Sequence, residues 1–170
     1  MEPRVVQREP MSLVGMEFYG NPSAGGPGWS MQNQVGRLWQ RFDAFWKTHQ
    51  GELRPQVVPG IWYELHIEPE TREDAETFCV MVGAEICKPA EMPLELSVRT
   101  LPACRYAILT FKGEQIRSAP GFIWQEWLPG SQYESAHKFL VEVYDEHRFQ
   151  GMESPNSELD FWVPVKPRKE

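Results

Sequence analysis

A glutamate stands in the middle of the strand-like segment 139–145 (FLVEVYD). Side chains alternate between the two faces of a β-strand, so Leu140, Glu142 and Tyr144 share one face of this segment. A buried carboxylate without a partner is costly, and a mid-strand glutamate therefore lies either on a solvated face or in a cleft that supplies partners. Leu140 and Tyr144 would make a poor solvated face, which favours a cleft for Glu142.

The segment 61–67 (IWYELHI) repeats this pattern. Its alternation places Trp62, Glu64 and His66 on one face, so a second glutamate lies beside an aromatic ring. Here the pattern is compatible with a solvated face as well as with a cleft, and it leaves both interpretations open for Glu64.

A carboxylate surrounded by aromatic rings is suited to binding an apolar cation. The rings provide apolar area and attract a cation through their quadrupole, by roughly 0.5–2 kcal/mol per good contact. The carboxylate provides the neutralising charge. We therefore predict Glu142 as the charged contact of a ligand, with Tyr144 and Trp62 as walls of the cleft. The further candidates for ligand binding are Trp39, Phe18, Phe111 and Glu64.

Catalysis by these residues is the main alternative. Glu64 and Glu142 could act as a general acid and base if they faced each other across a scissile bond, but the sequence does not give their separation. The four histidines show no metal-binding spacing, and no Cys–His pair, GxSxG elbow or phosphate-binding glycine loop occurs. We therefore expect no catalytic residue, no metal and no cofactor.

Composition and charge narrow the class of partner. The chain has 170 residues and a net charge of −7, from 17 Lys and Arg against 24 Asp and Glu, so direct nucleic-acid binding is disfavoured. Aromatic residues make up 12% of the chain, which is the resource that a ligand cleft needs. The basic cluster formed by Lys166, Arg168 and Lys169 is typical of a solvated tail.

Cellular location is predicted from the cysteines and from the apolar runs. Three cysteines without close spacing indicate reduced thiols in the cytoplasm rather than a disulfide framework. The first thirty residues do not form a signal peptide, and no apolar run approaches the length of a membrane span, so we expect no membrane partner.

The length fits a single domain, 1–170, of the α+β class. We expect a long first strand from Val5 to Gly20 with a bend at Pro10, and a first helix from an N-cap at Ser30 to about Gly51. An acidic turn at 68–76 separates two further strands. The remaining elements are predicted as strands at 61–67, 77–87, 94–99, 105–112, 137–145 and 158–165, with a second helix around 121–127.

The predicted order of strands and helix occurs twice along the chain, and some short residue motifs recur with it. Trp39-Gln40 recurs as Trp124-Gln125, Glu64 falls on Glu142, and Lys88-Pro89 recurs as Lys166-Pro167. We therefore predict two pseudo-symmetric strand–helix–strand–strand units, at about 1–90 and 91–170, which pair in an antiparallel sheet about a pseudo-twofold axis. Ligand sites favour such junctions, so the cleft is expected where the halves meet.

These segments resemble the GyrI-like and AraC-type effector-binding domains. The resemblance lies in the segment 126–133 (EWLPGSQY), in the following 139–146 (FLVEVYDE) with its Glu-x-Tyr, and in 158–166 (ELDFWVPVK). It extends over nearly the whole chain, with Gln132 in place of the usual glycine. It implies a cleft for lipophilic cationic compounds, with Glu142 as the charged contact and Tyr144 beside it.

Three functions follow from this resemblance. The first is a stand-alone protein that captures lipophilic cations, in a sequestering or regulator-related role, because no helix-turn-helix segment fits within the chain. The second is a small-molecule hydrolase that uses the same glutamate, and the third is an inhibitor that binds a topoisomerase. A separate regulator protein could be a partner, and an exposed strand edge would allow a homodimer.

Overall fold

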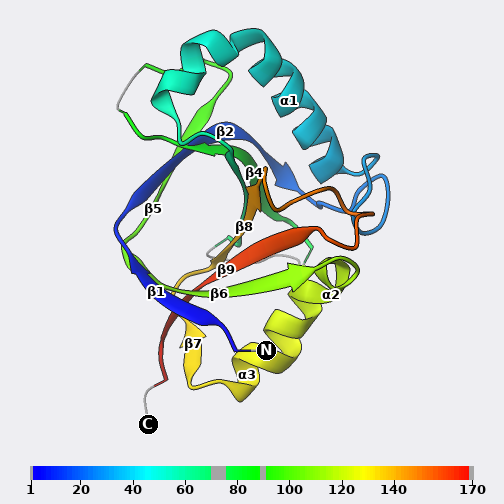
Figure 1. Ribbon diagram of the computed structural model, residues 1–170, viewed down its shortest axis with the longest axis vertical. Helices are drawn as coiled ribbons and strands as arrows, with labels where there is room; N and C mark the ends of the chain where they lie inside the picture. Colours follow the sequence, from blue (N-terminus) through cyan, green and yellow to red (C-terminus); the bar gives the residue numbers. More distant parts are fainter. Residues whose placement is uncertain (1, 70–75, 89–90, 169–170) are drawn as a thin grey trace.

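The computed structural model of the chain describes residues 2–69, 76–88 and 91–168. Residues 70–75 of the expected acidic turn, Pro89 and Lys169 lie outside the described residues. The described part forms one antiparallel sheet with helices on one side (Figure 1). The strands are β1 (Arg4–Arg8), β2 (Met11–Gly20), β3 (Ile61–Ile67), β4 (Phe78–Glu85), β5 (Ser97–Leu101), β6 (Cys104–Lys112), β7 (Tyr133–Ser135), β8 (Phe139–Asp145) and β9 (Glu158–Pro167).

The order of strands in the sheet is nearly palindromic. It runs β1-β6-β9-β8-β3-β4-β2-β5, with β7 added beside β9. The central pair is β3 and β8, followed outward by β4 and β9, then β2 and β6, then β5 and β1. Each half therefore has the order strand–helix–strand–strand, and the α+β fold with a large antiparallel sheet is confirmed. The pseudo-twofold axis passes between β3 and β8, where Glu64 lies opposite Glu142.

The first strand differs from its prediction. The segment 5–20 is divided at Glu9-Pro10 into β1, which pairs with β6, and β2, which pairs with β4 and β5. Pro10 lacks a backbone N–H, so the ladder ends there and the chain crosses to the other half of the sheet. β5 crosses in the opposite direction, so each half lends its first strand to the other.

The helices begin at other residues than predicted. The first helix, α1 (Gln34–Leu53), has its N-cap at Asn33, whose side chain accepts a hydrogen bond from the Gly36 N–H; Ser30 is not the cap. The second helical segment comprises α2 (Gln115–Phe122), a π-helical turn (Ile123–Trp127) and α3 (Leu128–Gly130). Pro120 lies inside α2, where it removes a single backbone donor, and the helical segment continues past Pro120-Gly121 into the π-helical turn.

Each helix packs on one half of the sheet, as Figure 1 shows, with α1 over β2 and β4 and α2 over β6 and β9. Under α1, Leu38 and Phe42 pack with Val80 and Val82 of β4. Under α2, the buried residues include Ile116, Ala119, Ile123, Leu109 and Phe161. The opposite face of the sheet buries a separate cluster that includes Tyr63, Leu65, Tyr106, Val141 and Trp162.

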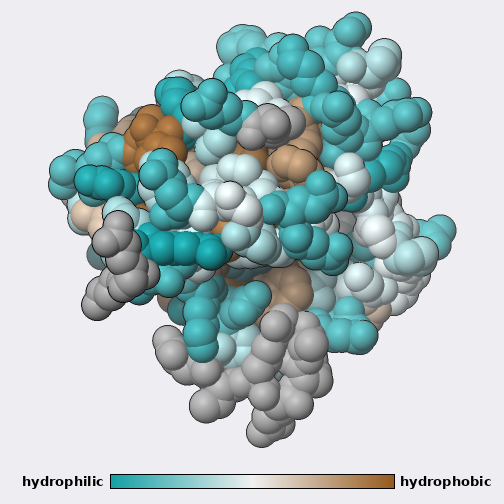
Figure 2. Space-filling model, turned by 90° about the horizontal axis from the view of Figure 1, so that it is seen from below, coloured by the Kyte–Doolittle hydropathy of each residue, from teal (hydrophilic) through white to brown (hydrophobic). Residues whose placement is uncertain are grey.

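The surface hydropathy, the cysteines and the lengths of the described helices do not by themselves identify the class of protein. The face in Figure 2 is largely hydrophilic, with hydrophobic atoms in separate small areas. Cys79, Cys87 and Cys104 are all free thiols. Among the described helices, none combines the length and the apolar character that crossing a membrane requires.

Two strands approach each other closely at a pair of glycines. Gly15 of β2 faces Gly83 of β4, and a Cβ atom added at Gly83 would collide with the carbonyl oxygen of Val14. We expect Gly83→Ala to lower the free energy of unfolding by about 1–3 kcal/mol, because the backbones would have to separate. Urea denaturation measures the loss.

Gly121→Ala is the matched control for this substitution. A Cβ atom at Gly121 meets no atom within 4 Å, and alanine is better than glycine inside a helix by about 1 kcal/mol. This variant should be at least as stable as the wild type. Equal stability of the Gly83 and Gly121 variants would show that the close approach is not required.

Candidate functional site

A large cleft lies over the centre of the sheet, between the two helical segments. Its volume is about 1190 Å³, enough for a drug-sized ligand. β3 and β8 form its floor, α1 and α2 contribute its walls, and the loop 21–33 and the segment 149–152 add to its rim. The junction of the two halves is therefore hollow, as the repeat predicts.

The floor of this cleft carries both central glutamates. Glu64 and Glu142 occupy directly opposed positions on β3 and β8, and the two residues are only 3% and 1% exposed. The alternation predicted for β8 is confirmed, because Leu140, Glu142 and Tyr144 line the cleft while Val141 and Val143 pack on the other face. Two like charges opposed on neighbouring strands repel each other, so this arrangement needs donors or a proton.

Glu64 is the carboxylate with most of the donors. Trp39 Nε1 donates to Glu64 Oε2 at 2.6 Å, and His66 Nε2 lies 2.7 Å from Oε1. The Tyr144 hydroxyl also points toward Oε2, at 3.5 Å. Burial would lower the pKa of His66, but the hydrogen bond and charge of Glu64, with the charge of Glu142, raise this pKa above its ordinary value. These contacts favour the imidazolium form of His66, which pairs with Glu64.

Among the described residues, Glu142 has one hydrogen-bond donor, the Tyr144 hydroxyl at 2.8 Å from Oε2. Burial, and then the charge of Glu64, raise the pKa of Glu142 to about 8, against the smaller opposing effects of His66 and Tyr144. Glu142 is therefore mostly protonated at neutral pH in the empty cleft. Burial and the same two carboxylates raise the pKa of Tyr144, which stays a neutral donor.

Aromatic side chains form the walls around these carboxylates. The rings of Trp39 and Tyr144 are 5.3 Å apart and steeply inclined, and Phe149 stands edge-on to Tyr144 at 4.8 Å. Trp62 packs against Trp46 at 4.8 Å and donates its indole N–H to Glu146 at 2.7 Å. The structure thus brings five of the predicted ligand-binding residues into one cleft. They are Glu142, Tyr144, Trp62, Trp39 and Glu64.

Phe18 and Phe111 do not line this cleft, and their prediction as walls is wrong. Phe111 is 3% exposed and packs against Phe122 and Phe161 in the core under α2. Phe18 packs at the edge of the cluster under α1. They lie on β6 and β2, each separated from the central pair by another strand, so the helices cover them.

Several lining residues were not predicted. Trp29 and Met31 come from the loop 21–33, and Arg117 and Trp124 come from the second helical segment. In the sequence this loop is recognised only as a turn-rich connection between a strand and a helix. Surface loops often carry binding residues, so its Trp and Met were the signal that could have indicated a place in the cleft. His66 was predicted to share a strand face with Glu64, but its hydrogen bond to Glu64 and its place in the cleft were not predicted.

The same residues provide one set of metal-ligand atoms among the described residues. Glu64, His66 and Glu142 each offer an atom within 4.8 Å of the others. Two carboxylates and an imidazole would suit a divalent ion such as zinc. These atoms are already paired with one another and with Trp39 and Tyr144, and His66 would have to lose its proton to bind a metal.

An antiparallel sheet of duplicated halves with an aromatic, carboxylate-containing cleft is the architecture of a small-molecule-binding domain. The family model for the GyrI-like small molecule binding domain matches residues 1–166. The chain therefore belongs to the GyrI-like small-molecule-binding domain family.

Individual relatives agree with this assignment. The chain is 29% identical over 167 residues to the transcriptional regulator BrlR of Pseudomonas aeruginosa, covering 97% of this chain and 56% of the regulator. It thus spans little more than half the length of that relative. The structure of SAV2435 bound to tetraphenylphosphonium has a TM-score of 0.64 and 18% identity, covering 98% of this chain and 94% of that one. A hydrolase encoded by lin2189 from Listeria innocua has a TM-score of 0.52 and 10% identity, with coverages of 97% and 92%. These two structures share the fold.

Proposed function

We propose that the protein captures lipophilic cations in the cleft between α1 and α2, with Glu142 as the charged contact. The observation that carries this proposal is a pair of buried, directly opposed carboxylates in the floor of an aromatic cavity of about 1190 Å³. A cation placed there would take the place of the proton on Glu142 and pair with its carboxylate, and the rings would surround the apolar part of the cation. An uncharged ligand would gain only the second of these effects.

The two glutamates have different roles in this proposal. Glu64 is already neutralised by His66 and holds the Trp39 ring in the wall through a hydrogen bond. Within the described part of the chain, Glu142 has only the Tyr144 hydroxyl as a donor, so it is the carboxylate whose charge is available to a ligand. An incoming cation replaces the proton of Glu142.

The relatives support this class of ligand. SAV2435 shares the fold, and its structure contains tetraphenylphosphonium, a bulky cation without hydrogen-bond donors. The cleft of this chain offers such a cation rings and a carboxylate. The relative BrlR is a transcriptional regulator, which supports a regulator-related role for ligand capture by this chain.

A thermal-shift titration with two phenyl-bearing probes tests the proposal. Tetraphenylphosphonium should raise the melting temperature in a saturable manner, because a ligand that binds only the folded state stabilises it. The neutral triphenylphosphine oxide should bind much more weakly, and calorimetry should give one site per chain for the cation. Equal stabilisation by both compounds would contradict a charged contact.

Replacing His66 should increase the affinity of the cleft for a cation. His66→Gln removes a positive charge from the cleft while glutamine can still donate to Glu64, so the cleft becomes more negative. We expect tetraphenylphosphonium to bind about threefold to thirtyfold more tightly at neutral pH, corresponding to about 0.7–2 kcal/mol. Calorimetry measures this change. His147→Gln, at an exposed position outside the cleft, should leave the affinity unchanged.

Hydrolysis is the second candidate function. A glutamate with a pKa near 8 beside a second carboxylate and a tyrosine could serve as a general base, and the lin2189 hydrolase shares the fold. Incubation with nitrophenyl esters distinguishes the two candidates. A binding protein should show no turnover above the buffer rate, whereas turnover that Glu142→Gln abolishes would establish an enzyme.

A further inference from the structure

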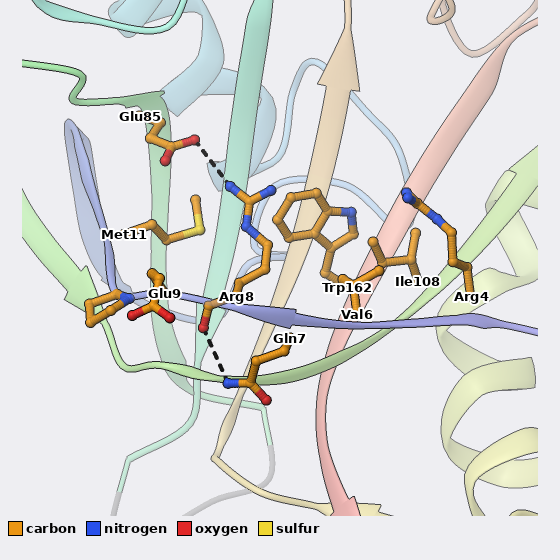
Figure 3. A pocket seen from close by; sticks show the side chains of 10 residues that line it. Arg4, Val6, Gln7, Arg8, Glu9, Met11, Glu85, Ile108 and Trp162 are labelled. Carbon is orange, nitrogen blue, oxygen red and sulfur yellow. Dashed lines mark hydrogen bonds and ion pairs between the residues drawn. The ribbon is translucent and has the colours of Figure 1, made fainter.

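A second, smaller cavity lies on the face of the sheet opposite the cleft. Its volume is about 400 Å³, and it is bounded by β1, the turn after it, the end of β4, and strands β6 and β9 (Figure 3). The alternation of β1 directs Arg4, Val6 and Arg8 toward this cavity, and Ile108 and Trp162 complete its apolar side. None of these residues belongs to the lining of the cation cleft.

Trp162 carries an unsatisfied donor at this cavity. Its side chain is 7% exposed, and its indole Nε1 is buried without a hydrogen-bond partner in the described part of the chain. A buried donor without an acceptor is costly, and tryptophan N–H groups usually have a partner when they are buried. The indole N–H therefore lacks the acceptor that a ligand in the adjoining cavity would supply.

Two arginines flank the indole ring of Trp162. The Arg8 guanidinium lies 4.7 Å from the ring centroid and forms an ion pair with Glu85 at 3.6 Å, which fixes it over the ring. Arg4 is exposed, with no ion pair or hydrogen bond to a described residue. Figure 3 shows the indole nitrogen of Trp162 on the side of Arg4, away from Arg8. An acceptor between Arg4 and Trp162 would find one fixed N–H donor and one available positive charge.

We propose that this cavity is a second ligand site, which binds a small monocarboxylate with an apolar body. The carboxylate accepts hydrogen bonds from the Trp162 indole and the Arg4 guanidinium, a charge-assisted pairing, and the apolar body lies against Val6 and Ile108. Glu9 and Glu85 also line the cavity and oppose an anion with two charges. This second site thus binds an anion, whereas the cleft binds a cation. The proposal for the second site does not depend on the proposed function of the cleft.

A nuclear magnetic resonance titration with phenylacetate tests this site. The indole N–H signal of Trp162, identified by its loss in Trp162→Phe, should shift downfield and saturate as a carboxylate accepts its hydrogen. Arg4→Ala should weaken phenylacetate binding by roughly tenfold, the usual effect of losing a charged hydrogen bond. Arg105→Ala is the matched control, because Arg105 is an exposed arginine on the neighbouring strand β6 outside the cavity, and it should leave the affinity unchanged.

Two companion ligands define the selectivity of the site. The neutral phenylacetamide and inorganic phosphate should both shift the Trp162 signal much less than phenylacetate, and saturating tetraphenylphosphonium should not displace phenylacetate. The proposal is overturned if phenylacetate causes no saturable shift up to roughly 10 mM, a range that includes weak specific binding. It is also overturned if Arg4→Ala and Arg105→Ala lower the affinity equally, or if phosphate binds as well as phenylacetate.

Discussion

Glu142→Gln should weaken the binding of tetraphenylphosphonium about thirtyfold or more, corresponding to about 2 kcal/mol or more, and leave the binding of triphenylphosphine oxide nearly unchanged. Glutamine keeps the shape of the side chain and can accept the hydrogen bond of Tyr144, but it cannot become negative when a cation enters. The loss is therefore confined to the charged ligand. Calorimetry with both compounds measures the difference.

The stability of this variant provides an internal control. The pKa of about 8 means that Glu142 is mostly protonated in the empty cleft at pH 7, so glutamine replaces a neutral carboxyl group. The melting temperature at pH 7 should be similar to that of the wild type. Glu126→Gln makes the same substitution at an exposed position outside the cleft, and it should leave the cation affinity unchanged. Equal losses for the cation and the neutral oxide would rule out an electrostatic role for Glu142.

The affinity for tetraphenylphosphonium should rise with pH and level off above about pH 8. The cation itself does not titrate, so the dependence comes from the protein. Glu142 must lose its proton to neutralise the ligand. His66, whose pKa is also raised, loses a positive charge that repels the cation as the pH rises, so both groups increase the affinity with pH. Below pH 8 the affinity should increase by up to about tenfold per pH unit from Glu142 alone. Calorimetry between about pH 6 and pH 9 measures this profile.

The empty protein should show the opposite trend in stability. The folded-state pKa of Glu142 is raised from 4.5 to about 8, so the folded state holds a proton that the unfolded chain loses, and stability falls as pH rises from about 4.5 to about 8. His66 contributes in the same sense, since its pKa is also raised in the folded state. Glu142→Gln should remove most of both trends. A cation affinity that is constant or falls with pH would contradict proton exchange at Glu142.

The sequence predicted the fold and the floor of the cleft because both depend on local patterns. The two-residue alternation in β8 placed Glu142 and Tyr144 on one face, and the recurrence of Glu64 at Glu142 indicated a pseudo-twofold relation between the halves. The structure places the axis between β3 and β8. Apolar periodicity identified α1, although its cap is Asn33. Family resemblance then indicated the ligand class that Glu142 is proposed to bind.

The remaining features depend on contacts between distant segments. The sequence does not show that the Trp39 indole reaches Glu64, or that Phe111, an aromatic residue on a similar strand, is covered by α2. The exchange of first strands between the halves is equally hidden, because a proline can bend a strand or end it. The second cavity is formed by this exchange, since β1 brings Arg4 and Arg8 to Trp162 of the other half.

The most direct test of the central claim is a crystal structure of the protein with tetraphenylphosphonium. We predict that the cation lies in the cleft between α1 and α2, in contact with Trp39, Trp62 and Tyr144, and that Glu142 is the carboxylate nearest to the phosphorus atom. A cation bound elsewhere, or one in the cleft whose nearest carboxylate is not Glu142, would contradict the account.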